Sequence, residues 1–296
     1  RSGMEGHHRW GLNAGKGPLG KSAVLALSTL PSSPLIWAGS YKDGLKAYDP
    51  ENQRFYHYLQ SVPGDSRQQA NMIWRIIPDP SLEAIWLATY QGLQRFDLIT
   101  KQFSRLPLVS TPGNGPSDEF GQSVLIDHQG WLWLGTVDGL FAYQPEADKR
   151  RVFGPNSDAR DGLKHPVASC LFEDSKQRLW IGTHGGGLHR FERKTETFEV
   201  LSIQDGLLSN VIKGITEDLQ GYLWISTDQG VSRLDVATGT FHNYTRHDGL
   251  RGGEYSRNAI LTDAEGFIYL GGSTGFDRFH PDNLRKNQHV PEVHLT

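Results

Sequence analysis

A chain of 296 residues is longer than one small core requires, although repeat folds and barrels reach this size as a single unit. Its net charge of −3 offers nothing that would steer it towards nucleic acid or an anionic membrane, and it has no run of roughly 18 apolar residues that would cross a bilayer as a helix. The single cysteine, Cys170, excludes an intramolecular disulfide and CxxC metal motifs. The chain start lacks the apolar core of a signal peptide, so we expect a piece of a longer protein.

Residues 1–23 contain two motifs that could suggest a binding site. Gly15–Ser22 matches the phosphate-binding P-loop pattern, and His7 and His8 are adjacent. A P-loop requires a helix directly after it, whereas the apolar residues from Val24 onward predict a strand. We therefore expect no nucleotide, metal or other cofactor here, and we interpret residues 1–23 as the outer strand of a preceding or incomplete repeat.

From residue 24 to residue 284 the sequence repeats a unit of about 45 residues. The anchors recur every 44 to 49 residues, and they are Trp37, Trp86, Trp133, Trp180, Trp224 and Tyr269. In each unit an apolar stretch and an acidic turn precede the anchor, and a Gly-ending hairpin, a Gly-Leu strand and an aromatic-bearing strand follow it. Four strands per unit predict an all-β fold, a β-propeller of four-stranded antiparallel blades. Six repeats are recognisable, which leaves six blades or an incomplete seventh as alternatives.

These motifs resemble the two-component regulator propeller repeat, which reads Leu-Trp-x-Gly-Thr, then Gly-Leu, then an aromatic residue with Asp. The best matches are Leu132–Tyr143, Leu179–Phe191 and Leu223–Asp235. The resemblance covers residues 24–284 and implies the periplasmic sensor region of a hybrid histidine kinase or a GGDEF-type regulator. It also implies that residues 285–296 are a linker and the first strand of a following immunoglobulin-like domain. A membrane-linked output module would come next, so any kinase or cyclase activity would lie outside this chain, which we expect to be no enzyme.

We expect ligand binding at the loops that enter the first strand of each repeat and at the loops between the second and third strands. In a propeller these loops share one end of the sheets, and the scaffold holds them rigidly. Packing positions stay alike between repeats, whereas these loop residues differ, and their mixture of Tyr, Arg, Asn, Asp and His suits a small polar ligand. Sugars are known ligands of the family that the repeats resemble, so a saccharide is the ligand we expect. The candidate residues are Arg67, Asn71, Tyr90, Asp118, Glu119, Asp138, His165, His184, Asn210, Asp228, Glu254, Tyr255, Arg257 and Asn258.

Other interpretations remain open from the sequence. Asn71 and Asn210 have the alternative of capping their own turns. The module has the alternative of being a protein-interaction scaffold or a homodimer without a small-molecule ligand. An enzyme is a third hypothesis, for which the pairs Glu173-Asp174 and Glu217-Asp218 would be the carboxylates. Because both pairs recur just before a turn, they predict turn chemistry instead.

Overall fold

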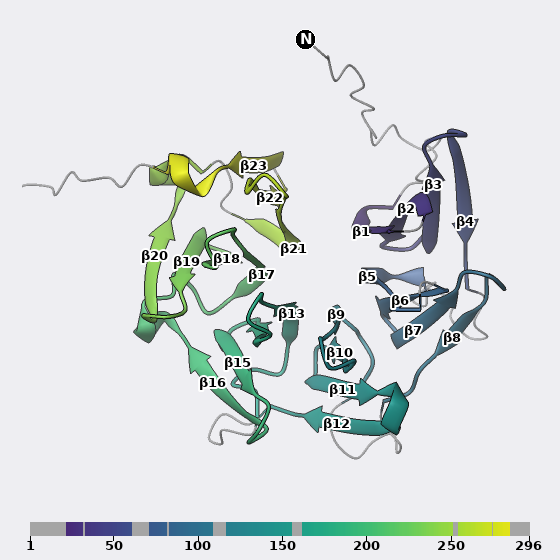
Figure 1. The fold of residues 1–296 in the computed structure, drawn as a ribbon, viewed down its shortest axis with the longest axis horizontal. Helices are drawn as coiled ribbons and strands as arrows, with labels where there is room; N and C mark the ends of the chain where they lie inside the picture. The colour runs from purple at the N-terminus through teal and green to yellow at the C-terminus, as the bar shows by residue number, and fades with distance from the viewer. Residues whose placement is uncertain are drawn as a thin grey trace, which may run out of the picture. The chain divides into compact units, whose positions relative to one another are not determined.

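A computed structural model describes residues 22–31, 33–60, 71–81, 83–108, 117–155, 162–250, 254–273 and 275–284. Within these ranges the chain forms five four-stranded antiparallel sheets and a sixth sheet of three strands. The sheets follow one another along the chain, and each is one blade (Figure 1). The expected all-β propeller is confirmed, with six blades among the described residues. No helix in these ranges is long and apolar enough to span a bilayer.

The chain divides into two compact units, of which unit 1 comprises residues 1–126, 132–137 and 141–151, and unit 2 comprises residues 127–131, 138–140 and 152–296. Unit 1 holds the first two sheets and most of the third. The strands of these sheets are β1 (Val24–Leu30), β2 (Ser33–Ser40), β3 (Leu45–Asp49) and β4 (Arg54–Tyr58); β5 (Ile73–Pro78), β6 (Ala84–Thr89), β7 (Gly92–Asp97) and β8 (Phe103–Arg105); β9 (Ser123–Ile126), β10 (Leu132–Gly135), β11 (Leu140–Gln144) and β12 (Lys149–Phe153).

Unit 2 holds the other three sheets, and its first strands lie together, β13 against β17 and β17 against β21 (Figure 1). Its strands are β13 (Ala168–Glu173), β14 (Leu179–Thr183), β15 (Leu188–Glu192) and β16 (Thr197–Leu201); β17 (Ile212–Glu217), β18 (Leu223–Thr227), β19 (Val231–Asp235) and β20 (Thr240–Tyr244); β21 (Tyr255–Thr262), β22 (Ile268–Gly272) and β23 (Gly275–Phe279).

The Trp-bearing second strands are buried on both faces. Every residue of β6, β14 and β18 is buried, because these strands lie inside their sheets and have a sheet on each side. Trp180 of the fourth sheet packs with Ile212 and Leu223 of the fifth, and Trp224 of the fifth packs with Ile268 of the sixth. Burying such side chains between sheets contributes about 1.5–3 kcal/mol each, so each sheet depends on its neighbour.

The hairpin between the second and third strands ends in the predicted glycine in every sheet. Gly92 and Gly187, for example, have φ of +88° and +80°, a region that favours glycine. A Cβ on Gly187 would lie 2.4 Å from the backbone oxygen of Leu201, so the turn excludes any larger residue.

The first strands share an irregularity in their pairing with the second strands. In four sheets one first-strand residue is skipped, and the skipped residues are Leu25, Trp74, Ser169 and Lys213. In the sixth sheet the irregularity is larger, since four residues, Ser256 to Ala259, lie opposite the single residue Gly271. Such a bulge bends a strand and redirects its side chains.

Two expectations for the chain start have different outcomes. Ser22 is followed by strand β1 from Val24, so the helix that a P-loop requires is not formed there. The remaining residues of the P-loop match, His7, His8 and the expected strands in residues 1–21 and 285–296 lie outside the described residues.

Candidate functional site

Two sets of loops meet at one end of the sheets in each unit. In unit 1, the Phe120 amide of the segment entering the third sheet donates to the Tyr90 carbonyl at 2.8 Å. In unit 2, Gly185 and Gly187 of the fourth sheet donate to the Asn210 carbonyl of the segment entering the fifth, at 3.0 and 3.1 Å. We call this end, formed by the second-to-third hairpins and the segments entering the first strands, the loop end.

Several candidate residues of unit 1 serve the fold. Asn71 is buried, its Oδ1 accepts from the Gln60 amide at 2.8 Å, and its Nδ2 donates to the Gln60 carbonyl at 3.1 Å. Asp118 is also buried and accepts from the Leu108 amide at 2.5 Å and from Arg105 at 3.0 Å. These two side chains form structural hydrogen bonds, and that of Asn71 is to Gln60, eleven residues earlier in the chain.

Other candidates near them have fewer structural contacts. The Glu119 carboxylate lies 3.8 Å from Arg105, and the half-buried Tyr90 ring lies edge-on to Phe120. Asp138 is half-buried in the hairpin of the third sheet. Arg67 lies outside the described residues.

Unit 2 brings two candidate histidines together at the loop end. The His165 and His184 ring centroids are 6.2 Å apart, and His184 is exposed. His165 Nδ1 accepts from the Val167 amide at 3.2 Å, which directs Nε2 away from the backbone. Burial, with a smaller contribution from neighbouring His184, lowers the pKa of His165, so this ring is neutral at pH 7. The hairpin residues Gly185 and Gly186 face His165, and a Cβ on either would come within 3.0 Å of it.

The remaining candidates of unit 2 divide into structural and unassigned residues. Asn210 Oδ1 accepts from the Ile203 amide at 3.0 Å, so it too forms a structural hydrogen bond. Tyr255 is buried and its hydroxyl donates to Asp277 at 2.8 Å, and burial raises the pKa of this phenol strongly. Asp228 is half-buried, and its Oδ1 has no hydrogen-bond partner among the described residues. Glu254 is exposed.

The structure corrects the sequence on Tyr255, Arg257 and Asn258, which were expected in an entering loop. All three lie within strand β21, because the sixth sheet begins at Tyr255. Arg257 and Asn258 fall in its bulge, where Asn258 has a φ of +56° and its Nδ2 donates to the Ser169 carbonyl of β13 at 3.5 Å.

Sequence reasoning missed a second recurring position, which we call the third-strand anchor. It is the residue directly after Gly-Leu or its equivalent at the start of the third strand. Its side chain hydrogen-bonds to the segment that enters the same sheet or, in the sixth sheet, to the first residue of the first strand. Gln94 Nε2 donates to the Gln60 Oε1 at 3.1 Å, His189 Nε2 accepts from the Lys164 amide at 3.0 Å, Ser232 Oγ accepts from the Leu208 amide at 3.1 Å, and Asp277 accepts from Tyr255. The signal available in the sequence was a polar residue directly after Gly-Leu or its equivalent in each of these third strands.

His189, like Ser232, is fully buried among these anchors. Its side chain has no exposed surface, and burial lowers the pKa of the imidazole to about 4. Because its Nε2 accepts from an amide, the neutral ring carries its proton on Nδ1. It therefore acts as a fixed acceptor for the loop.

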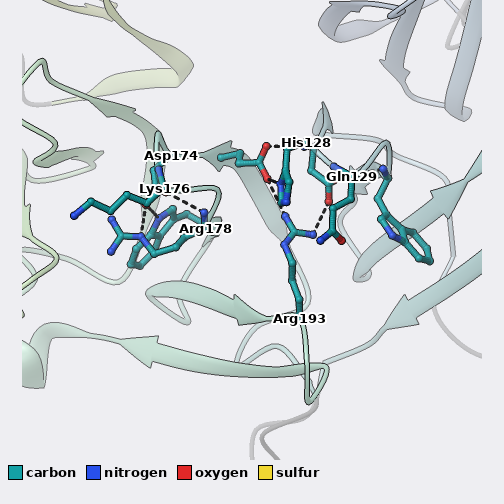
Figure 2. Close-up of polar contacts among 10 residues, drawn as sticks. His128, Gln129, Asp174, Lys176, Arg178 and Arg193 are labelled. Carbon is teal, nitrogen blue, oxygen red and sulfur yellow. Dashed lines mark hydrogen bonds and ion pairs between the residues drawn. The ribbon is translucent and has the colours of Figure 1, made fainter.

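The acidic pairs are held in turns, as the sequence predicted. Asp174 Oδ1 accepts from the Lys176 and Arg178 amides at 3.0 and 2.9 Å, and its Oδ2 accepts from the Trp180 indole at 2.8 Å (Figure 2). The same carboxylate-to-aromatic contact recurs from Asp79 to Trp86 at 2.6 Å, from Asp218 to Trp224 at 2.7 Å and from Asp263 to Tyr269 at 3.0 Å.

The first residue of each pair joins neighbouring turns. Glu173 accepts from the His128 amide at 2.8 Å, and Arg193 lies 2.6 Å from Asp127 and 2.8 Å from Glu173 (Figure 2). Glu217 repeats this contact with the Ser175 amide at 2.7 Å. The carboxylates are therefore occupied by structural partners, and no set of three or more His, Cys, Asp or Glu side chains among the described residues could hold a metal ion.

Comparisons with known proteins agree with this architecture. Residues 162–185 match the family described as Two component regulator propeller. Histidine kinase P4 of Formosa agariphila is 30% identical over 219 residues, which are 72% of this chain but 16% of that protein, so the chain spans about a sixth of that relative.

Two solved structures from B. thetaiotaomicron share the fold over 90% of this chain. The extracellular domain of BT3049, described as part of a hybrid two component system, has a TM-score of 0.76 at 22% identity, with 34% of its own chain covered. The extracellular domain of BT4673, described in the same terms, has a TM-score of 0.51 at 24% identity, with 37% covered. At these identities the likeness establishes the β-propeller fold. The resemblance read from the repeated Trp motif is thereby confirmed, and the chain carries a two-component regulator propeller repeat within a β-propeller.

Proposed function

We propose that this chain is the ligand-sensing, extracytoplasmic propeller module of a bacterial two-component or diguanylate cyclase receptor. The ligand that we propose is a polar molecule such as a saccharide, bound at the loop end. The observation that carries this proposal is that some polar side chains at the loop end form structural hydrogen bonds and others do not. Asn71, Asp118, Asn210 and Tyr255 form structural hydrogen bonds, whereas His184 is exposed beside His165 at the loop end of unit 2 and its side chain has no hydrogen bond among the described residues.

The comparisons support the receptor context. The curated relative is a histidine kinase, and the two solved relatives are extracellular domains of proteins described as hybrid two component systems. A periplasmic location, a following immunoglobulin-like domain and a membrane-linked output module belong to this proposal. A ligand drives such a receptor only through different affinities for its two signalling states, and a rigid propeller can present the loops that differ between those states.

The proposal assigns no reaction to this chain. The acidic side chains that a hydrolase or lyase would need in the recurring turns are already bonded to amides, indoles and guanidinium groups. Catalysis would follow in the output module, not at the loop end.

Calorimetric titration of the 296-residue chain with a panel of neutral and acidic saccharides tests the proposal. We expect binding by at least one saccharide, and His165→Ala and His184→Ala should each weaken it about tenfold, the loss of one or two hydrogen bonds. His242→Ala, an exposed histidine of β20, is the matched control and should leave the affinity unchanged.

A protein-interaction scaffold is the second candidate function, and the edge of the sixth sheet favours it. Strand β23 is the outer strand of that sheet among the described residues, and Phe276 on it is 67% exposed. An exposed apolar edge suits a second chain, including another copy in a homodimer. No binding across the saccharide panel together with a stable dimer in light scattering would replace the sensor proposal with this one.

A further inference from the structure

The bulge of β21 sets Arg257 apart from other residues of the first strands. Four residues lie opposite one at this point, and the left-handed backbone of Asn258 with its contact to the Ser169 carbonyl holds the bulge against β13. A non-glycine residue in this conformation is uncommon, and such bulges often direct a side chain to a functional position. Arg257 is one of the four residues of this bulge.

The charge of Arg257 has no acidic partner among the described residues. Its side chain is half-buried and makes no hydrogen bond or ion pair within the described part of the chain. The one ionisable group that acts on this guanidinium among the described residues is the buried Cys170 thiol of β13. Burial accordingly lowers the pKa of this guanidinium.

The contrast with the other arginines of unit 2 is informative. Arg178 and Arg193 pair with the buried carboxylates of Asp174 and Asp127, and Arg233 lies over the Tyr222 ring. A cation removed from water without a partner destabilises a fold, so its retention at the loop end suggests that the partner is external.

We propose that Arg257 is an oxyanion-binding residue, and that the ligand of this module carries a carboxylate or sulfate group that it receives. The proposal rests on the proposed ligand-binding role of the loop end and specifies the chemistry of that ligand as an acidic saccharide. A guanidinium offers two parallel N–H donors to such a group, and charge-assisted hydrogen bonds are about twice as strong as neutral ones. Asn258 is a positioning residue, because it holds the bulge and does not itself receive the anion.

The experiment compares acidic and neutral probes on the full 296-residue chain. Sodium glucuronate is titrated against glucose, and sodium sulfate against sodium chloride at equal ionic strength, by calorimetry and by thermal unfolding. The variants are Arg257→Gln and Arg257→Lys, with Arg278→Gln, at an exposed arginine of β23 in the same unit, as the matched control. Because sulfate stabilises any fold, the control variant shows how much of the change in unfolding temperature does not depend on Arg257.

We expect glucuronate to bind more tightly than glucose, and Arg257→Gln to weaken glucuronate binding about tenfold or more. Arg257→Lys should retain part of the affinity and Arg278→Gln all of it. Without ligand, Arg257→Gln should unfold at the same or a higher temperature than the parent, because an uncompensated charge has been removed. If Arg257 served the fold, Arg257→Gln would instead unfold at a lower temperature than the parent.

Two results would overturn the inference. A chain that binds glucose as tightly as glucuronate would retain the proposed sensor function but not an oxyanion site. An Arg257→Gln variant that unfolds at a lower temperature and keeps its glucuronate affinity would show that Arg257 serves the fold.

Discussion

At the scale of single residues, the contact between an aromatic donor and a turn carboxylate recurs in the second, fourth, fifth and sixth sheets, with a tyrosine replacing tryptophan in the sixth. Tyr269 preserves the contact because its hydroxyl also donates to the turn carboxylate. The first sheet differs, since the Trp37 indole is buried and has no hydrogen-bond partner among the described residues. The chain thus contains a natural comparison between a bonded and an unbonded anchor.

Trp224→Phe should therefore destabilise the protein more than Trp37→Phe. Both changes remove similar buried volume, but only the first leaves the buried Asp218 Oδ2 without its indole donor, which adds about 1–3 kcal/mol. Denaturant unfolding of the two variants measures the difference. Equal losses would show that the indole bond contributes nothing beyond packing.

His189 makes stability dependent on pH. Its pKa is about 4 in the folded protein against 6.5 ordinarily, so the unfolded chain binds more protons between these values. The contribution is fully present above pH 6.5 and is lost as pH falls towards 4, on the order of 3 kcal/mol in total.

Urea unfolding from pH 7 to pH 4 checks this expectation. His189→Gln can still accept from the Lys164 amide but cannot titrate, so its stability should fall less steeply over this range. An unchanged slope would mean that other groups cause the acid destabilisation. His242→Gln, at an exposed site, is the control and should behave as the parent.

At the scale of the elements, the hairpin glycines differ in how much space surrounds them. Gly187→Ala should destabilise strongly, since its Cβ would meet the Leu201 oxygen at 2.4 Å in addition to the unfavourable φ. Gly239→Ala shares a positive φ of +71° but has nothing within 4 Å of its Cβ, so we expect only about 1 kcal/mol there. Thermal unfolding of the pair separates backbone strain from steric overlap, and similar midpoints would contradict this reading.

The strands were predictable because their physical requirements recur. A central strand with a sheet on each side must be apolar on both faces, so Trp86, Trp180 and Trp224 identified their sheets directly. Turn carboxylates were likewise predictable from their spacing before the anchor. The exception is β21, whose bulge turned an expected loop into a strand because pairing register depends on contacts that no local motif specifies.

The site was harder to predict for a related reason. A polar residue at the loop end either binds a ligand or satisfies a buried backbone group, and only the three-dimensional contacts separate these roles. Asn71, Asp118 and Tyr255 proved to be structural, whereas His189 and Asp277 were overlooked because they lie in a strand.

At the scale of the whole molecule, neighbouring sheets within each unit stack so that each buries a face of the next. The cluster between the fifth and sixth sheets joins Trp224 and Val231 to Tyr255, Ile268 and Leu270. In such stacked repeats stability is shared between neighbouring units. Losing one sheet should therefore weaken the sheet beside it.

A chain ending at Leu250 should lose several kcal/mol of unfolding free energy, because each large apolar side chain returned to water costs about 1.5–3 kcal/mol. The exposed face of the fifth sheet should also bind a hydrophobic dye. Denaturant unfolding and dye fluorescence measure both effects. A truncated chain that unfolds at the parent's midpoint would show that the fifth sheet is stable without the sixth.

The anchor residue of each third strand has a consequence for how these repeats diversify. A loop is tied to a side chain lying 24 to 34 residues further along, as in Leu208 with Ser232 and Gln60 with Gln94. A loop transplanted alone would lose its hydrogen-bond partner in the third strand. The loop and that one residue therefore have to be inherited together. Ligand specificity could then change one sheet at a time, provided that the loop and its partner residue are exchanged together.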